Sequence, residues 1–415
     1  MRLFSRSYCR RGLAGAMTVT LSAAATVVAL GLATPAAASD DFYTPPSPLP
    51  AGGNGDIVKS QPSKYSNATS TRIMYLSRDQ RNQATPITGT VVVPAKAWTG
   101  PGPRPIVAYA PFTAGMGDQC ATSKTMAGEG SDLVSGFQNS FIDALLGQGF
   151  AVAETDYQGL GTPGDHPYVM RAPEAHAVLD VLRAAQRLPG TGLAPDGPLG
   201  IAGYSEGGGA SASAAELAAT YAPELHIKGA YAGAAPADKA VLAKTLDGST
   251  YAGFLAFALI GIQTAYPDSG ILDLANPTGA QLFLEARQTC TLDAVLKFAG
   301  KNTSALTKDG RPVAAYLDQE PFRSIVAANK LGTVKPSFPV IVEHSTADDV
   351  IPYATGKQLA KDWCAEGADV QFKDIVSILP FFSHLLGMST ASGTAASWLA
   401  DRFAGKPTAS NCGSL

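Results

Sequence analysis

Short apolar runs alternate with segments of helical periodicity along most of the chain. Strands are predicted at 91–93, 105–110, 150–153, 199–203, 229–232, 339–342 and 370–372, and the first of these follows a polar, hairpin-like region. Helices are predicted at 137–146, 172–188, 208–221, 355–363 and 395–403. This alternation is typical of an α/β fold whose mostly parallel sheet is covered by helices on both faces.

Two stretches depart from the alternation. Residues from Asp40 to about Pro62 are rich in Pro, Gly and Ser and predict an irregular N-terminal arm. Between about Pro236 and Pro336 the pattern is mainly helical, and Tyr251–Ile262 is apolar on nearly every side, so this helix must be buried. Its place between two strands favours a cap over a functional site, although a core helix of the main domain is the alternative. We therefore expect a core of residues 39–235 and 337–415, interrupted by a cap of residues 236–336.

The first 38 residues have the pattern of a secretory signal peptide. Arginines at 2, 6, 10 and 11 precede an apolar stretch from about Ala16 to Leu32, and three alanines at 36–38 suit signal peptidase. We expect cleavage after Ala38 and secretion of the mature chain. The small residues and the acidic segment that follows argue against a membrane anchor. The Arg10-Arg11 pair leaves twin-arginine export open, though its flanks fit that signal poorly.

Composition narrows the function. The formal net charge is -3 and the pI about 6.0, so the chain has no basic surface for nucleic acid and suits a neutral or apolar substrate. Cys9 leaves with the signal peptide, and the four remaining cysteines are Cys120, Cys290, Cys364 and Cys412. An even number in an exported protein predicts two disulfides, for which three pairings exist. None lies in a Cys-x-x-Cys or His/Cys cluster, so we expect no metal and no cofactor.

The segment Gly203-Tyr204-Ser205-Glu206-Gly207 matches Gly-x-Ser-x-Gly, the nucleophile elbow. Glycine is abundant, at 43 of 415 residues, so the pattern alone is weak. Its context strengthens it, because an apolar strand precedes Ser205 and an Ala-rich helix follows. In such a turn the serine hydroxyl is exposed and the next backbone N–H points toward a developing oxyanion.

A nucleophilic serine needs a histidine base, which follows an acid in the chain order Ser, acid, His. That order excludes His166 and His176, and His226 follows Ser205 too closely to leave room for an acid. His384 lies in an apolar stretch interpreted as the loop between the last strand and the last helix, and we select it. His344 precedes the acid candidates and is interpreted as a packing residue or a second contact of the site.

The acid is expected directly after the strand at 339–342. Asp348 and Asp349 are both candidates in Ser345-Thr346-Ala347-Asp348-Asp349-Val350-Ile351-Pro352. In many hydrolases the acid lies four residues before the proline of such a turn, which selects Asp348 and leaves Asp349 as a solvated or capping neighbour. The oxyanion donors are expected to be the N–H groups of Glu206 and of Thr113, in the loop after the strand at 105–110.

Four segments together resemble the secretory lipases related to Candida antarctica lipase A. They are Gly-Tyr-Ser-Glu-Gly-Gly around Ser205, Thr-Asp-Tyr-Gln-Gly-Leu-Gly at 155–161, Asp-Asp-Val-Ile-Pro-Tyr at 348–353 and Ser-His-Leu-Leu-Gly at 383–387. The resemblance implies an α/β-hydrolase fold with an inserted helical cap. It also implies that Cys120 pairs with Cys290 and Cys364 with Cys412. The yeast lipase has Gly at the position of Glu206, and a carboxylate there would weaken the oxyanion hole unless it is turned away or protonated.

These features predict a secreted serine hydrolase that cleaves carboxylic esters, most simply lipid esters, through an acyl-enzyme. It could make transient contact with lipid interfaces, and apolar residues beside His384 could line an acyl pocket or belong to the core: Leu379, Phe381, Phe382, Leu385 and Leu386. The same machinery could instead serve an esterase, an acyltransferase, a peptidase or a polymer-degrading esterase. A different class is a catalytically idle, lipid-binding surface protein.

Overall fold

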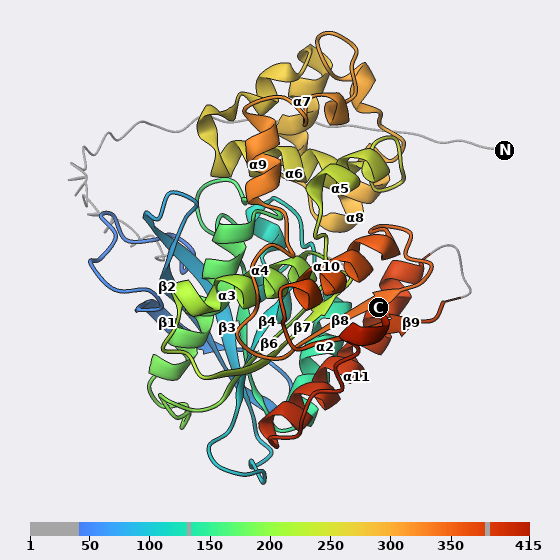
Figure 1. Ribbon diagram of the computed structural model, residues 1–415. Coiled ribbons are helices and arrows are strands. Elements are labelled where there is room, and N and C mark those ends of the chain that lie inside the picture. The colour runs from blue at the N-terminus through green and yellow to red at the C-terminus, as the bar shows by residue number, and fades with distance from the viewer. Residues whose placement is uncertain (1–40, 131–133, 378–381) are drawn as a thin grey trace, which may run out of the picture. The chain divides into compact units, whose positions relative to one another are not determined.

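The apolar runs of the sequence pair into one mixed sheet. The computed structural model describes residues 41–130, 134–377 and 382–415, and in these the sheet has nine strands in the order β1-β2-β3-β5-β4-β6-β7-β8-β9 (Figure 1). The strands are β1 (Ile57–Ser63), β2 (Ala68–Arg78), β3 (Ala84–Pro94), β4 (Ile106–Ala110), β5 (Ala151–Thr155), β6 (Leu199–Tyr204), β7 (Ile227–Gly233), β8 (Val340–Ser345) and β9 (Val370–Ile375). From β5 to β9 neighbouring strands are parallel, as the sequence predicts.

The antiparallel edge formed by β1, β2 and β3 is predicted only in part, by the strand at 91–93 and the hairpin-like region before it. The expectation of an irregular arm holds for residues 41–56 but is wrong from Ile57 to Pro62, because β1 pairs with β2 there. No strand was expected where β2 lies, yet β2 and β3 pair in register over their full length. Strand β2 buries an apolar run at 73–76 and also the polar Ser70 and Arg72, and Arg72 is paired with Glu129.

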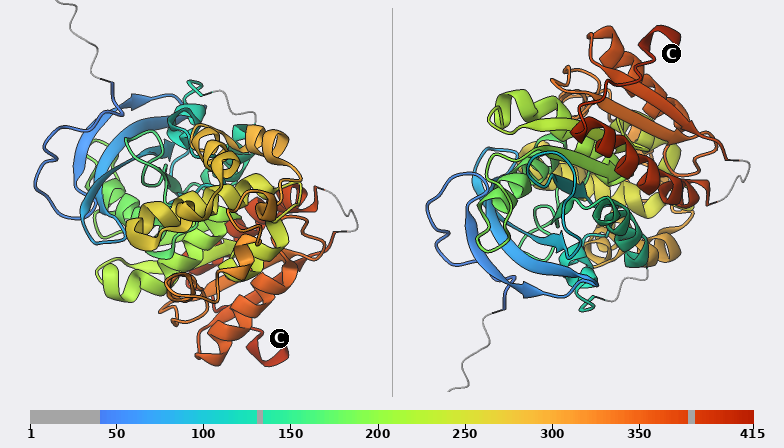
Figure 2. Two further views of the ribbon diagram at one scale, coloured as in Figure 1. Left: turned by 90° about the horizontal axis from the view of Figure 1, so that it is seen from above. Right: turned by 90° about the horizontal axis from the view of Figure 1, so that it is seen from below.

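Helices cover both faces of the sheet, as the views from above and below show (Figure 2). Alternate side chains of β4 point to opposite layers: Ile106 and Ala108 pack in one apolar cluster, and Val107 and Tyr109 in another. The first cluster contains α3 (Arg171–Arg187), α4 (Glu206–Tyr221) and α10 (Tyr353–Ala365). The second contains α2 (Ser135–Gly147) and α11 (Ser383–Phe403). The short α1 (Thr122–Met126) precedes α2.

Two of the helix starts that differ from the prediction lie next to candidate site residues. Helix α4 begins at Glu206, two residues earlier than expected, directly after the elbow serine. Helix α11 begins at Ser383 instead of Ala395, so His384 lies in a helical first turn and the loop expected there is wrong. The stretch 383–394 contains two glycines and several Ser and Thr residues, which are weak helix formers. The carboxylate of Asp349, distant in sequence, supports this turn by accepting N–H groups of Phe382 and His384.

The segment between β7 and β8, residues 234–339, forms a group of helices that we call the helical insertion (Figure 1). Its α-helices are α5 (Lys239–Leu246), α6 (Ala252–Ala265), α7 (Pro277–Ala286), α8 (Thr291–Phe298) and α9 (Phe322–Ala328). Helix α6 is the predicted all-apolar helix. It is buried because it packs in one cluster with other helices of the insertion and with core loop residues such as Tyr168 and Ile351. Among the described residues the segment contains no strand.

The disulfide pairs are those that the family resemblance implies. Cys120 bonds to Cys290 and thereby joins the loop after β4 to the helical insertion, and Cys364 bonds to Cys412 beside the C-terminus. The predicted signal peptide lies outside the described residues. In the part that the structure describes, no helix has both the length and the apolar character that crossing a bilayer requires.

Candidate active site

Ser205 occupies the sharp turn between β6 and α4. Its backbone has φ 60° and ψ −124°, a conformation that non-glycine residues rarely adopt. A Cβ atom on Gly207 would lie 1.9 Å from the carbonyl oxygen of Ala110, and one on Gly203 would lie 2.1 Å from the carbonyl oxygen of Gly207. The two glycines are therefore required by close backbone approach, as the elbow motif predicts.

The three side chains selected from the sequence form one chain of hydrogen bonds. His384 Nδ1 lies 2.7 Å from Asp348 Oδ2, and His384 Nε2 lies 2.9 Å from Ser205 Oγ. Because the carboxylate accepts the Nδ1 hydrogen, the neutral imidazole turns its Nε2 lone pair toward the serine hydroxyl. Tyr204 also holds this histidine, since its hydroxyl donates to the His384 carbonyl oxygen at 2.8 Å.

Asp348 is arranged as a buried carboxylate. Its Oδ1 accepts the N–H groups of Val350 and Ile351, at 3.0 and 2.8 Å. Burial alone would raise the pKa of this carboxyl, but the neighbouring His384 and His344 outweigh burial and hold the pKa well below its ordinary value. Asp348 is therefore ionised and can stabilise a positive charge on His384.

Asp349 has a different part. Its Oδ1 accepts the backbone N–H of His384 at 2.9 Å, and its Oδ2 accepts the N–H of Phe382 at 3.0 Å and the hydroxyl of Tyr251 at 2.7 Å. It is thus the capping neighbour foreseen from the sequence, and it also links α11 to the start of α6. Only Asp348 touches the imidazole ring among these two, which favours it as the orienting acid.

His344 is the second contact of this acid. The ring is fully buried, and its Nε2 donates to the Ile351 carbonyl oxygen at 3.0 Å while lying 3.5 Å from Asp348 Oδ2. Gly356 leaves it room, because a Cβ there would lie 2.2 Å from His344 Nδ1. The ring makes no contact with Ser205 that would let it act as base.

The two residues chosen as oxyanion donors lie on adjoining segments. The N–H of Glu206 is the first of α4, and the first N–H groups of a helix have no partner within it. Thr113 lies in the loop after β4, where its carbonyl oxygen accepts a hydrogen bond from the Thr291 hydroxyl and its own hydroxyl bonds Tyr168 at 2.8 Å. The elbow packs directly against this loop, because Gly207 closely approaches Ala110 and Pro111.

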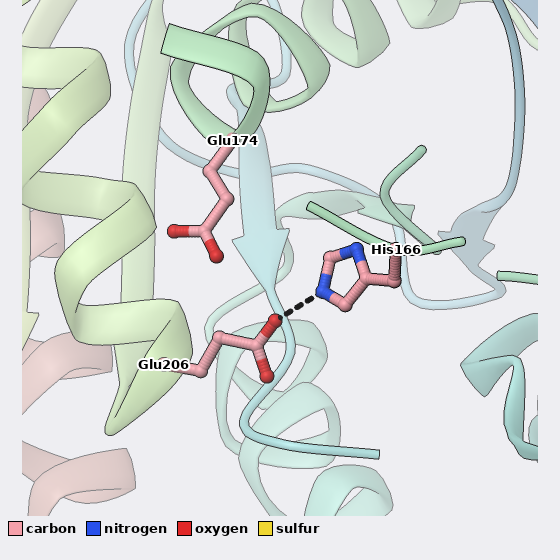
Figure 3. Close-up of side chains that lie close together, drawn as sticks. All are labelled: His166, Glu174 and Glu206. Atoms are coloured by element: carbon pink, nitrogen blue, oxygen red, sulfur yellow. Dashed lines mark hydrogen bonds and ion pairs between the residues drawn. The ribbon is translucent and has the colours of Figure 1, made fainter. Parts of the chain in front are cut away.

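The Glu206 side chain is turned toward the protein interior (Figure 3). Its Oε1 lies 2.7 Å from Nε2 of His166, and both side chains are buried. Burial raises the pKa of Glu206 and lowers that of His166 to about 4, so the neutral forms are favoured. The sequence analysis considered His166 only as a base and excluded it. Its nearness in sequence to the 155–161 segment was the signal that could have suggested another role.

Glu174 completes this buried cluster. Polar atoms of His166, Glu174 and Glu206, all groups that bind metals, lie within 4.8 Å of one another. Hydrogen bonds already occupy them: Glu206 bonds His166, and Glu174 Oε1 accepts the Val169 N–H at 2.7 Å. We therefore interpret the cluster as a hydrogen-bonding network and not as a metal site.

An apolar pocket of about 480 Å³, partly open to solvent, lies above Ser205. Its walls come from the helical insertion and from two core loops, and include Leu242, Leu246, Phe254, Leu255, Ala258, Val350 and Ile351. The acyl-pocket residues suggested from the sequence that the structure describes are not among them. Phe382 and Leu386 are exposed, Leu385 packs with the α2 and α11 layer, and Leu379 and Phe381 lie outside the described residues.

A mostly parallel sheet with a nucleophile elbow after β6, and with the acid and base candidates after the later strands β8 and β9, defines the α/β-hydrolase fold. Within this class, the chain belongs to the secretory lipase family, whose model matches residues 129–411.

The relatives agree with this family. A "probable inactive lipase" of Mycobacterium tuberculosis is 30% identical over 381 residues, which cover 89% of this chain and 82% of the relative. Lipase A of Moesziomyces aphidis is 30% identical over 393 residues, covering 90% and 82%. The structure of Candida antarctica lipase A in its closed state superposes with a TM-score of 0.78 at 26% identity, covering 91% and 88%. The rice cell wall degrading esterase LipA of Xanthomonas oryzae shares the fold, with a TM-score of 0.71 at 20% identity.

Proposed function

We propose that this protein is a secreted serine hydrolase that cleaves carboxylic esters of lipids through an acyl-enzyme. The observation that carries the proposal is the hydrogen-bond chain from Asp348 through His384 to Ser205, at the floor of an apolar pocket. A polar triad beneath an apolar wall suits a substrate with an ester group and a hydrocarbon chain.

In the proposed mechanism, His384 takes the proton of the Ser205 hydroxyl as the oxygen attacks the ester carbonyl. Asp348 stabilises the imidazolium, and the N–H groups of Glu206 and Thr113 bind the oxyanion. His384 then gives its proton to the leaving alcohol. In the second half, His384 activates a water molecule that hydrolyses the acyl-enzyme and frees the acid.

Export is part of the proposal. The family is a secretory one, and two disulfides suit an oxidising compartment outside the cytosol. We propose cleavage near Ala38. Transient contact with lipid interfaces is supported by Phe382 and Leu386, which are 67% and 50% exposed and lie within two residues of His384.

The second candidate is a lipid-binding protein without turnover. One observation favours it: the relative from Mycobacterium tuberculosis is named a probable inactive lipase. In this chain the serine, imidazole and carboxylate groups are in hydrogen-bond contact, which supports the enzyme instead.

Hydrolysis of p-nitrophenyl esters from acetate to palmitate by the mature protein tests the proposal. Triad variants Ser205→Ala and His384→Ala should each lower kcat by about 10⁴-fold or more. His226→Ala is the control, because His226 is exposed and lies away from the site. An inert wild-type protein that still binds fatty acids would favour the lipid-binding candidate. A fully active Ser205→Ala variant would instead overturn the assignment of Ser205 as nucleophile.

A further inference from the structure

His166, the buried hydrogen-bond partner of Glu206, has no part in the proposed mechanism. Glu206 follows the nucleophile directly, so a negative charge on its side chain would lie beside the site where the oxyanion forms. His166 is fully buried, and it bonds the carboxyl group of Glu206 (Figure 3).

The proton positions of this pair follow from its contacts. His166 Nδ1 lies 3.0 Å from the carbonyl oxygen of Gln158, which can only accept, so Nδ1 carries a hydrogen. The hydrogen bond between Nε2 and Glu206 Oε1 therefore holds one further proton. Whether that proton belongs to the carboxyl or to the imidazole, the pair is neutral as a whole.

The residues that pack against His166 also contact the loop of Thr113, the second proposed oxyanion donor. The ring stacks on Tyr157, with centroids 5.4 Å apart, and meets the edge of Tyr168 at 5.9 Å. The Tyr157 hydroxyl donates to the Pro111 carbonyl oxygen at 2.8 Å, and the Tyr168 hydroxyl bonds Thr113. One buried ring is thus packed between the two tyrosines that hold the loop of Thr113.

We propose that His166 is a positioning residue for the oxyanion hole: it holds the Glu206 side chain in a buried, neutral pair and, through Tyr157 and Tyr168, supports the loop of Thr113. This inference rests on the proposed function. It gives a role to the 155–161 segment, because Tyr157 stacks on the ring and Gln158 fixes its tautomer.

The pair also determines a pH dependence. The other titratable groups that face it are Glu174 of α3, Lys239 of α5, Tyr157 and Tyr168. Burial raises the pKa of Glu206, and a hydrogen bond from Thr113 acts weakly against this. Above that raised pKa the bridging proton is lost, the pair becomes negative, and the oxyanion is destabilised. Activity should therefore decline at alkaline pH, whereas any decline in acid comes from protonation of the triad base.

The test compares Glu206→Gln with the wild-type protein from about pH 5 to pH 10, by pH-stat assay of ester hydrolysis. A glutamine amide can donate to His166 Nε2 but cannot ionise. Each pH profile is scaled to its own value at neutral pH, and on that scale we expect no alkaline decline for Glu206→Gln. An alkaline decline that is unchanged in Glu206→Gln would overturn the inference.

Variants of the histidine test positioning. His166→Ala should lower kcat by about 10- to 100-fold, less than or similar to the loss of one oxyanion donor, with KM nearly unchanged. His166→Gln, which can accept the Glu206 proton through its amide oxygen, should recover part of that loss. His226→Gln is the matched control. The concentration of functional enzyme comes from titration of Ser205 with a fluorophosphonate, so a poorly folding variant is not mistaken for a slow one.

The outcomes separate the two proposals. If the wild-type enzyme and its Glu206→Gln variant both lack turnover, the proposed function fails. If both turn over with the same alkaline decline, or if His166→Ala keeps the wild-type kcat, only the positioning role fails. Inactivation by a chelator with recovery on adding a divalent cation would also overturn it, because the cluster would then bind metal.

Discussion

The sheet and the helical insertion bury their apolar side chains in different ways. Strands β4, β5 and β6 are buried along their whole length, and side chains alternate between two helical layers. The insertion instead gathers around the single helix α6, and some of its outer side chains remain open to solvent, such as Leu284 at 57% and Leu296 at 71% exposure. The first arrangement is held by ladder hydrogen bonds and packing on both faces, the second mainly by one apolar cluster.

This difference separates two tasks. Ser205, Asp348 and His384 all follow strands of the sheet, at its carboxyl edge, whereas half of the residues that line the pocket above Ser205 belong to α5 and α6. The proposed chemistry therefore depends on the sheet, and the choice of acyl chain depends on the insertion. Substitutions in the two regions should affect different kinetic constants, and four experiments test this, beginning with the largest expected effect.

The largest difference in kcat is expected between substitutions of the two neighbouring aspartates, Asp348 and Asp349, at the edge of the sheet. Asp348→Asn removes the charge that orients His384 and should lower kcat by about 10⁴-fold, because the amide favours the wrong tautomer. Asp349→Asn loosens the first turn of α11 and the contact with Tyr251, and should cost about tenfold or less. Measurement of kcat for a short ester decides between them. A larger loss in Asp349→Asn would reverse the assignment of the acid.

A methyl group at the elbow should matter more than one on a helix surface. Gly207→Ala places a Cβ 1.9 Å from a carbonyl oxygen, so the elbow must shift, and kcat should fall by about 10²- to 10³-fold, as for loss of an oxyanion donor. In α11, Gly393→Ala meets nothing within 4 Å and should raise the free energy of unfolding by about 0.5–1 kcal/mol. Steady-state kinetics measure kcat of Gly207→Ala, and urea unfolding measures the stability of Gly393→Ala. Normal turnover by Gly207→Ala would contradict the strained elbow.

The two disulfides offer a comparison of the regions themselves. Each double Cys→Ser variant should lose about 2–4 kcal/mol of unfolding free energy. Only the pair Cys120 and Cys290 joins the insertion to the core, so only its removal should also raise KM for long-chain esters. The pair Cys364 and Cys412 is the control. Equal changes of KM in both variants would show that the link does not shape the pocket.

Substitutions on opposite faces of α6 should have the smallest effect on activity but the most selective one, because they should change the preference for acyl chain length. Ala258 lines the pocket above Ser205, and Ala258→Leu should lower kcat/KM for palmitate by about tenfold with little change for acetate. Ala256 lines a separate apolar pocket inside the insertion, so Ala256→Leu should leave the chain-length profile unchanged. A profile across acyl chain lengths distinguishes them. If Ala256→Leu shifts the profile instead, long chains enter the second pocket.

Local patterns were enough to predict the parallel strands, the elbow and the order of the triad candidates. Apolar runs indicate buried strands because a strand covered on both faces has no polar side. The glycines at 203 and 207 indicate the elbow because only glycine allows the backbone to approach so closely. The antiparallel edge was predicted only in part, at 91–93. Strand β2 was not predicted: it buries the polar Ser70 and Arg72 beside the short apolar run at 73–76.

The tertiary structure decided what depends on residues that are far apart in the chain. The start of α11 depends on Asp349, which replaces the missing local support for a helix of weak formers. The state of Glu206 depends on His166, forty residues earlier in the chain. The sequence by itself determined which chemical groups are present and which predicted strand each of them follows in the chain. Their partners, tautomers and charges were set only by folding, because hydrogen bonding and burial act through space and not along the chain.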